Sequence, residues 1–292
     1  MRTTIFLSVF CLSLLFAHVS LALPETEQNT YTNSIGMEFV LIPAGSFNEP
    51  PYHSPMLYGK VGPRTFIISQ PFYLGKYPVT QEQWKAVMGN NPSRFKGRSN
   101  PVENISWEDV QEFIRRLNAR EKHARYRLPT RTEWELAARG GTRDIQVFFI
   151  PDLEFWSAWG RDTEDVEVHW EESPRRLAAY AWFGENSNGS TQPVGQKKPN
   201  QYGLYDIYGN VLEWVQDWWG GDTHQDREFT DYHGPVDGNS RWLCGCNWSS
   251  QAKRCKSDAG DVAPPSTRDP RMGFRLALSK GKNGPNENTT GK

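Results

Sequence analysis

Three helix N-termini constrain the fold more than any other feature of this sequence. At each one, a threonine or serine is followed three residues later by a side chain that can bond back to the first backbone amide. Such a pair satisfies two of the amide groups that a helix leaves free at its start. Apolar residues recur at helical spacing behind each pair, which predicts three helices. The pairs are Thr80 with Gln83, Ser106 with Asp109, and Thr130 with Glu133.

The segments outside these helices are short and broken by turns. The run MEFVLIPAGSF, which starts at Met37, is apolar until Pro43 and Gly45 end it, and it predicts a buried strand and a turn. Thr65 to Ser69 is a second candidate strand, and later in the chain short strands alternate with glycine- and tryptophan-containing turns. No Pro/Gly/Ser-rich linker divides the sequence. We therefore expect one irregular α+β domain with little regular secondary structure over residues 35–278.

The first residues match an export signal. A basic start precedes an apolar run from Ile5 to Ala17, and small residues at Ser20 and Ala22 mark a cleavage site. The run is too short for a comfortable membrane span. We expect an exported protein, periplasmic or secreted, with no stable membrane insertion after cleavage. The expected flanking segments are the signal peptide 1–22, a polar lead-in 23–34, an acidic-aromatic insertion 144–178 and a disordered tail 279–292.

The charge balance excludes one broad class of function. The chain has 33 lysines and arginines against 34 aspartates and glutamates, a formal net charge of -1. It therefore has no global basic field to drive binding to nucleic acid. The sequence also has no HxxxH or HxH pair and no GxSxG, phosphate-binding glycine loop or CxxC motif. These absences direct attention to the cysteines.

A series of short motifs runs from about residue 35 to residue 278. They are 36–45 (GMEFVLIPAG), Pro78-Val79-Thr80, Pro101-Val102, Ser106-Trp107, 126–135, 193–200, 203–218 and the closing Gly273-Phe274-Arg275. In this order the motifs resemble the formylglycine-generating enzyme family, also called the sulfatase-modifying-factor family. The resemblance implies one compact, asymmetric α+β domain that is distantly similar to C-type lectins.

The stretch GLYDIYGNVLEW carries a candidate calcium site. Asp206 and Glu213 supply carboxylate oxygens on either side of a turn at Gly209, where a bent backbone can add carbonyl ligands, as calcium prefers. The resemblance implies the same ion, since Asp206 and Glu213 stand at side-chain calcium positions of the family, and Gly209 and Val211 at carbonyl positions. We expect a structural Ca²⁺. The alternative is that Asp206 caps a turn while Glu213 pairs with an arginine.

The best-known activity of the family depends on two cysteines that hold copper(I), an ion that selects soft thiolates. The resemblance implies where these cysteines would lie. Counted from Trp248, Ser250 falls at the first position and Cys255 at the second. A hydroxyl cannot replace a thiolate for copper(I). We therefore expect neither a copper cofactor nor formylglycine generation. Cys255 instead matches a structural cysteine of many members that do not generate formylglycine.

Three cysteines of the expected mature chain lie within twelve residues, at the family's reactive segment. Cys244 and Cys246 point to opposite faces if this segment is a strand, so they are poorly placed to bond each other, but either can pair with Cys255. Three outcomes stay open. They are one structural disulfide with one buried thiol, a disulfide between chains, and a rearranged site in which Cys255, Cys246 and Cys244 are catalytic.

Two classes of function follow for such a protein. In the first, it acts on or binds a peptide-like or small ligand in the family cleft, with Asn247, Trp248 and Ser250 as cleft residues. If catalytic, it would be an oxidoreductase, because the family includes a periplasmic pyoverdine-maturing oxidoreductase that does not rely on the copper cysteine pair. In the second, it is a non-catalytic lectin-like binding protein whose binding face is Arg241 to Arg271, where retroelements diversify some relatives. The remaining alternative is a formylglycine generator with relocated cysteines.

Overall fold

The computed structural model of the protein describes residues 29–49, 52–54, 59–121, 124–140, 177–220 and 227–279. The predicted signal peptide, all but the last two residues of the predicted insertion, and residues 280–292 of the predicted tail lie outside these ranges. Among the residues described, none of the helices has the length and apolar character needed to span a bilayer.

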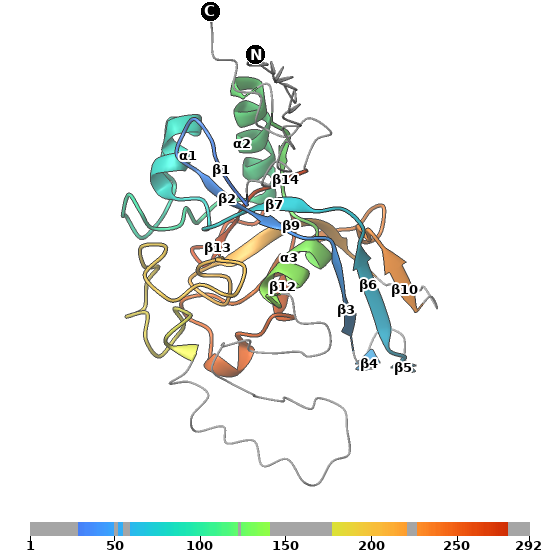
Figure 1. The fold of residues 1–292 in the computed structure, drawn as a ribbon. Helices are drawn as coiled ribbons and strands as arrows, with labels where there is room; N and C mark the ends of the chain where they lie inside the picture. The colour runs from blue at the N-terminus through green and yellow to red at the C-terminus, as the bar shows by residue number, and fades with distance from the viewer. Residues whose placement is uncertain are drawn as a thin grey trace, which may run out of the picture.

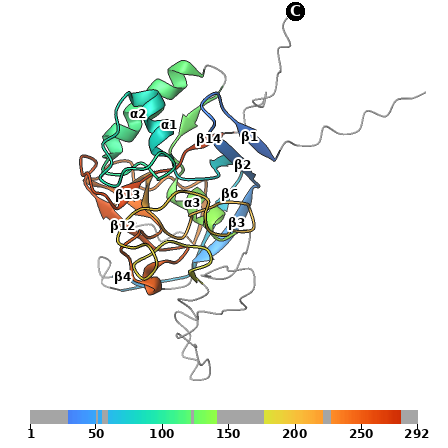
Figure 2. The same cartoon turned by 90° about the vertical axis from the view of Figure 1, so that its left-hand side faces the viewer.

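The three predicted helices are confirmed. They are α1 (Gln81–Met88), α2 (Trp107–Arg120) and α3 (Arg131–Ala138), and each starts with a complete capping box. At α1, the backbone amide of Gln83 donates to the hydroxyl of Thr80, and the Gln83 side chain accepts from the Thr80 amide. α1 and α2 pack together on one side of the molecule, whereas α3 lies near its centre (Figures 1 and 2).

Short strands form the rest of the framework, and β3, β6 and β10 project together on one side (Figure 1). The β9 strand lies centrally and pairs with β11 on one side and β13 on the other. In spatial order, the sheets of the described residues are β1 (Thr30–Thr32), β2 (Glu38–Ile42), β7 (Phe72–Gly75), β14 (Ala277–Ser279) and β8 (Tyr126–Arg127); β10 (Glu228–Thr230), β6 (Arg64–Ile68) and β3 (Gly45–Glu49); β12 (Gly260–Ala263), β11 (Ser240–Cys244), β9 (Leu212–Trp219) and β13 (Met272–Gly273); and β4 (Tyr52–Ser54) with β5 (Gly59–Val61).

The folded part starts earlier than the sequence predicts. Residues 30–32, expected to belong to a loose lead-in, form β1 and pair antiparallel with β2. The Tyr31 hydroxyl lies 3.1 Å from that of Tyr126, which joins this strand to β8 of the same sheet. The prediction of a loose lead-in is therefore wrong for these residues, because contacts distant in sequence order a segment that has no apolar run of its own.

The buried side chains form two clusters, which divide the molecule around the central strand β9. One cluster packs α1 and α2 against β7 and β13. The other surrounds α3 and includes Phe47, Phe66 and all three cysteines of the reactive segment, Cys244, Cys246 and Cys255. The reactive segment is thus anchored in the core on the α3 side of the molecule.

Candidate functional site

The reactive segment begins with β11 and makes a sharp turn at Gly245. Gly245 has a φ of 84°, in the left-handed region that favours glycine, and a Cβ placed there would lie 3.2 Å from the Trp134 side chain. After this turn, residues 246–251 form a loop, and the 3₁₀ helix η1 (Ala252–Arg254) precedes β12. The turn moves Cys246 out of the strand that contains Cys244.

The cysteines adopt one of the arrangements that the sequence left open. Cys246 and Cys255 form a disulfide, with their Cα atoms 5.0 Å apart, and Cys244 is a free, buried cysteine. Burial raises the pKa of the Cys244 thiol well above its ordinary value, so this thiol stays protonated at neutral pH. None of the three cysteines offers an accessible thiolate here. A catalytic role for them stays a prediction, and it would require reduction of the disulfide first.

A pocket of about 330 Å³ opens beside the disulfide. All of its lining residues except Leu212 belong to the stretch from Gly245 to Arg271, within the binding face that the sequence predicts. Most of these residues are polar, so the pocket suits a hydrophilic ligand rather than an apolar one. The lining consists of Leu212, Gly245, Cys246, Asn247, Ser249, Ser250, Gln251, Arg254, Gly260, Asp261 and Arg271.

The three predicted cleft residues have different positions. Asn247 and Ser250 line the pocket, whereas Trp248 does not. The indole nitrogen of Trp248 donates to the carbonyl of Pro270 at 3.0 Å, and its ring packs edge-on against Phe95. Trp248 therefore anchors the loop. Sequence reasoning did not single out the pocket residues Arg254 and Asp261, because no motif or periodicity marks them.

The two halves of the disulfide loop are held in different ways. The first half bonds to the domain: the Trp248 amide donates to the carbonyl of Asn210, and the Gly184 amide donates to that of Ser250. The hydrogen bonds of residues 251–255, within the described part of the chain, run only among themselves. This second half is attached to the core by the Cys255 sulfur and by packing of Ala252. The disulfide is thus the main link between this wall of the pocket and the core.

The predicted calcium residues lie close together in a different arrangement. Both oxygens of Glu213 bind the guanidinium of Arg275, at 2.7 Å each, and one also accepts from the Trp134 indole at 2.6 Å. Asp206 accepts from the Gly195 amide at 2.7 Å, and its φ of 55° places it in a turn. The Gly209 carbonyl accepts from the Val211 amide. A calcium ion does not fit here, since Arg275 already supplies the positive charge at Glu213.

A chelator tests the calcium prediction directly. We expect the melting temperature of the protein to be the same with 5 mM calcium and with excess EDTA, because a ligand stabilises a fold only if the native state binds it. Differential scanning calorimetry of the purified protein measures this. A rise of several degrees with calcium would restore the metal site and imply that Arg275 moves away from Glu213.

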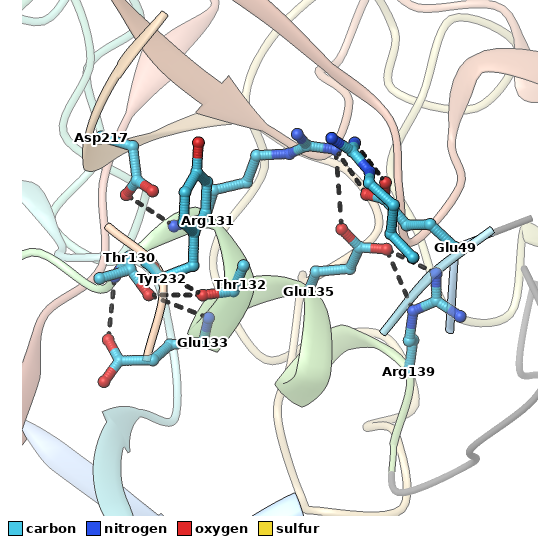
Figure 3. A network of polar contacts seen from close by, with 10 residues as sticks. Glu49, Thr130, Arg131, Thr132, Glu133, Glu135, Arg139, Asp217 and Tyr232 are labelled. Carbon is cyan, nitrogen blue, oxygen red and sulfur yellow. Dashed lines mark hydrogen bonds and ion pairs between the residues drawn. The ribbon is translucent and has the colours of Figure 1, made fainter. Parts of the chain in front are cut away.

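A buried network of charges surrounds the start of α3 (Figure 3). Arg139 and Glu135 are paired at 2.5 Å, and Glu49 binds Arg131 at 3.1 Å. The backbone amide of Arg131 donates to Asp217, whose pKa burial raises to about 7. The sequence contained no signal for this network beyond the abundance of carboxylates, since its members come from segments far apart in the chain. Each carboxylate in it has a partner, so we interpret the network as structural.

Glu103 gives the stability of the fold a pH dependence. Its carboxyl is fully buried, one oxygen accepts from the Phe95 amide at 2.8 Å, and the other has no hydrogen-bond partner. Burial raises the pKa of Glu103 from 4.5 to about 7. The folded state therefore binds this proton more tightly than the unfolded state does. The contribution of Glu103 to the free energy of unfolding is therefore complete below pH 4.5 and is lost as the pH rises to 7.

We expect the Glu103→Gln variant to lose less stability than the wild type between pH 5 and pH 7, with a difference on the order of 1–2 kcal/mol. Urea unfolding at a series of pH values measures it. The control is Glu112→Gln on α2, because the arginines at 115 and 116 hold the pKa of Glu112 at about 2, outside this window. Equal pH profiles for the wild type and Glu103→Gln would contradict the assignment.

Comparison with known proteins shows what the chain is similar to. Residues 24–280 match the family described as Sulfatase-modifying factor enzyme 1-like domain. The chain is 30% identical over 244 residues to "Chaperone protein LppX" of Paenibacillus barcinonensis, a match that covers 72% of this chain and 80% of that protein. It is 32% identical over 203 residues to the formylglycine-generating enzyme of Streptomyces coelicolor, covering 68% of this chain and 59% of the enzyme.

Among solved structures, "Treponema denticola variable protein 1" has the same fold, with a TM-score of 0.66 and 33% sequence identity. That match covers 86% of this chain and 98% of the Treponema chain. The predicted α+β fold is therefore confirmed. The chain spans about three fifths of the Streptomyces enzyme, so similarity to that enzyme does not carry over its activity.

Proposed function

Because the chain belongs to the sulfatase-modifying factor enzyme 1-like family, we propose that it is an exported member that binds a peptide-like ligand in its pocket and does not generate formylglycine. One observation carries the proposal, namely that all the pocket's lining residues but Leu212 lie within 245–271, a stretch that includes most of the reactive segment and belongs to the predicted binding face. Similarity to a protein named a chaperone supports a ligand that is itself polypeptide.

The chemistry of the segment argues against copper-dependent oxidation. Counted from Trp248, the family resemblance implies Ser250 and Cys255 at the two copper-cysteine positions; Ser250 lines the pocket, and Cys255 is bonded to Cys246. Copper(I) would find no pair of thiolates at these positions. Incubation with copper(I) and a Cys-x-Pro-x-Arg peptide should therefore leave the peptide's mass unchanged, and conversion to an aldehyde would refute this part of the proposal.

The lining of the pocket favours a non-catalytic binding protein over an enzyme. The disulfide provides no free thiolate, and hydroxyl, amide and guanidinium groups line the space beside it. Such groups recognise polar ligands without any chemical step. The second form, a maturation oxidoreductase, needs reduction of Cys246–Cys255 before either sulfur can react.

Affinity selection tests the binding function. A solution library of random hexapeptides is passed over the immobilised mature protein, and retained peptides are identified by mass spectrometry. The blocking variant is Gln251→Trp, which adds bulk at an exposed residue of the pocket wall, and the control is Thr230→Trp at an exposed position of β10. We expect retention by the wild type and by Thr230→Trp but not by Gln251→Trp. Equal retention by all three would refute pocket binding.

A further inference from the structure

Arg254 is the cation of the pocket lining that has no ion-pair partner among the described residues. Its side chain is exposed, lines the pocket, and has no ion-pair or hydrogen-bond partner among the described residues. The other lining arginine, Arg271, is already paired, because its Nε and Nη2 atoms donate to Asp269 at 2.8 and 2.7 Å. Arg254 therefore presents a full set of guanidinium donors to whatever enters the pocket.

Asn247 supplies a second, independent sign of what the pocket binds. The residue as a whole is only 6% exposed. The Oδ1 atom accepts from the amide and the hydroxyl of Ser249, at 2.8 and 2.7 Å. Because a backbone amide can only donate, these bonds fix which side of the Asn247 amide is oxygen. The Nδ2 group makes no hydrogen bond with the described residues and is not among their buried unpaired atoms, so on an otherwise buried residue it is an accessible donor without a protein acceptor.

Ser250 adds a further donor. Its hydroxyl oxygen accepts from the Asn247 amide at 3.1 Å, which leaves the hydroxyl proton available to a ligand. The single carboxylate of the lining, Asp261, already accepts from the Val262 amide through one oxygen. Asp261 is the one anion of this lining, and beside it the Arg254 guanidinium, the Asn247 Nδ2 group and the Ser250 hydroxyl are donors without a protein acceptor among the described residues.

We infer that the pocket binds a carboxylate group of a peptide, with Arg254 as its ionic partner and the Asn247 amide and Ser250 hydroxyl as neutral donors. This inference rests on the proposed function and adds the chemical class of the ligand. A carboxylate accepts several hydrogen bonds at once, and its bonds to a guanidinium are among the stronger ones in proteins. The carboxylate can be an aspartate or glutamate side chain or the C-terminus of the peptide.

The hexapeptide library distinguishes these sources when it is made in two forms, with free and with amidated C-termini. Enrichment of Asp and Glu in both forms supports recognition of side-chain carboxylates. Retention of the free form alone supports recognition of the C-terminus. If retained peptides depend on the pocket, as judged with Gln251→Trp, but show neither enrichment, the inference is overturned while the proposed function stands. If no peptide depends on the pocket, both fail.

Two matched variants test the role of Arg254. We expect Arg254→Gln to weaken binding of a retained synthetic peptide at least tenfold, as loss of a charge-assisted hydrogen bond does. The control, Lys253→Gln, removes the same charge from the neighbouring exposed residue of η1, which does not line the pocket, and we expect a change of less than threefold. Isothermal titration calorimetry measures both, and equal losses would overturn the pairing with Arg254.

Asn247→Asp provides a second variant with nearly unchanged shape. Its Oδ1 can still accept from Ser249, but a carboxylate oxygen replaces the free Nδ2 donor and repels an anionic ligand. We expect at least a tenfold loss of affinity for the carboxylate peptide, with the melting temperature within a few degrees of that of the wild type. Unchanged affinity in this folded variant would overturn the inference.

Discussion

The Arg275→Met variant is expected to lose about 3–5 kcal/mol of unfolding free energy, because it leaves the buried charge of Glu213 without its partner. The side chains of Arg275 and Glu213 are 0% and 1% exposed. Arg275 also donates to the carbonyls of Gly75 and Tyr205, at 2.9 and 3.0 Å, so the variant leaves those acceptors unpaired too. Chemical denaturation measures the loss.

The control for this prediction is Arg115→Met. Arg115 pairs with Glu112 on the surface of α2, where the two side chains are 69% and 34% exposed, and solvent screens such pairs so that they contribute little to stability. If Arg275→Met is too unstable to purify, the double variant Arg275→Met/Glu213→Gln should recover soluble, folded protein because it removes the buried charge. A loss no larger than that of Arg115→Met would contradict the account of this ion pair.

Removal of the disulfide is the second large effect. We expect Cys246→Ser/Cys255→Ser to lose about 2–3 kcal/mol, the value that loop entropy predicts for a short closed loop. The cysteines are nine residues apart. The effect should be concentrated in residues 251–255, whose hydrogen bonds run only among themselves. Trypsin should therefore cut the variant first at Lys253 and Arg254, which are exposed.

Cys244→Ala is the matched control for the disulfide variant, since Cys244 takes no part in the bond. We expect this variant to match the wild type in its rate of trypsin cleavage at Lys253 and Arg254, and both proteins to melt at a lower temperature in dithiothreitol. The disulfide variant should melt at the same temperature with and without dithiothreitol. If reduction changed neither the melting temperature nor the cleavage pattern of the wild type, the disulfide would not be what fixes residues 251–255 in the pocket wall.

Local features could be predicted from the sequence, and contacts between distant segments could not. The capping boxes at Thr80, Ser106 and Thr130 predict the three helices, because their partners lie three residues away. Cys244 and Cys246 are not bonded to each other, as expected, but the expected reason was wrong, because β11 ends at Cys244 and the turn at Gly245 takes Cys246 out of the strand. The sequence alone could not show whether Cys244 or Cys246 bonds to Cys255, since the answer depends on the turn at Gly245.

Residues that meet across the fold account for what sequence reasoning missed. Glu213 and Arg275 are 62 positions apart, so the sequence supported a calcium ligand and an arginine partner as alternatives for Glu213. The pocket shows the same limit. Its loop residues Asn247 and Ser250 were predicted, but Leu212 and Arg271 join them because the Leu212 amide bonds the Arg271 carbonyl beside the β9–β13 pairing.

The Cys246–Cys255 disulfide closes the reactive segment beside the pocket and leaves Cys244 as the one free cysteine among the described residues. Its test is a cysteine map of the protein produced from residue 23 onward under oxidising conditions, alkylated under denaturing conditions without reductant and digested with trypsin. We expect one alkylated thiol, on Cys244, and a disulfide that links the peptide 242–253 to the peptide Cys255-Lys256. Alkylation of both Cys246 and Cys255 in that sample would contradict it.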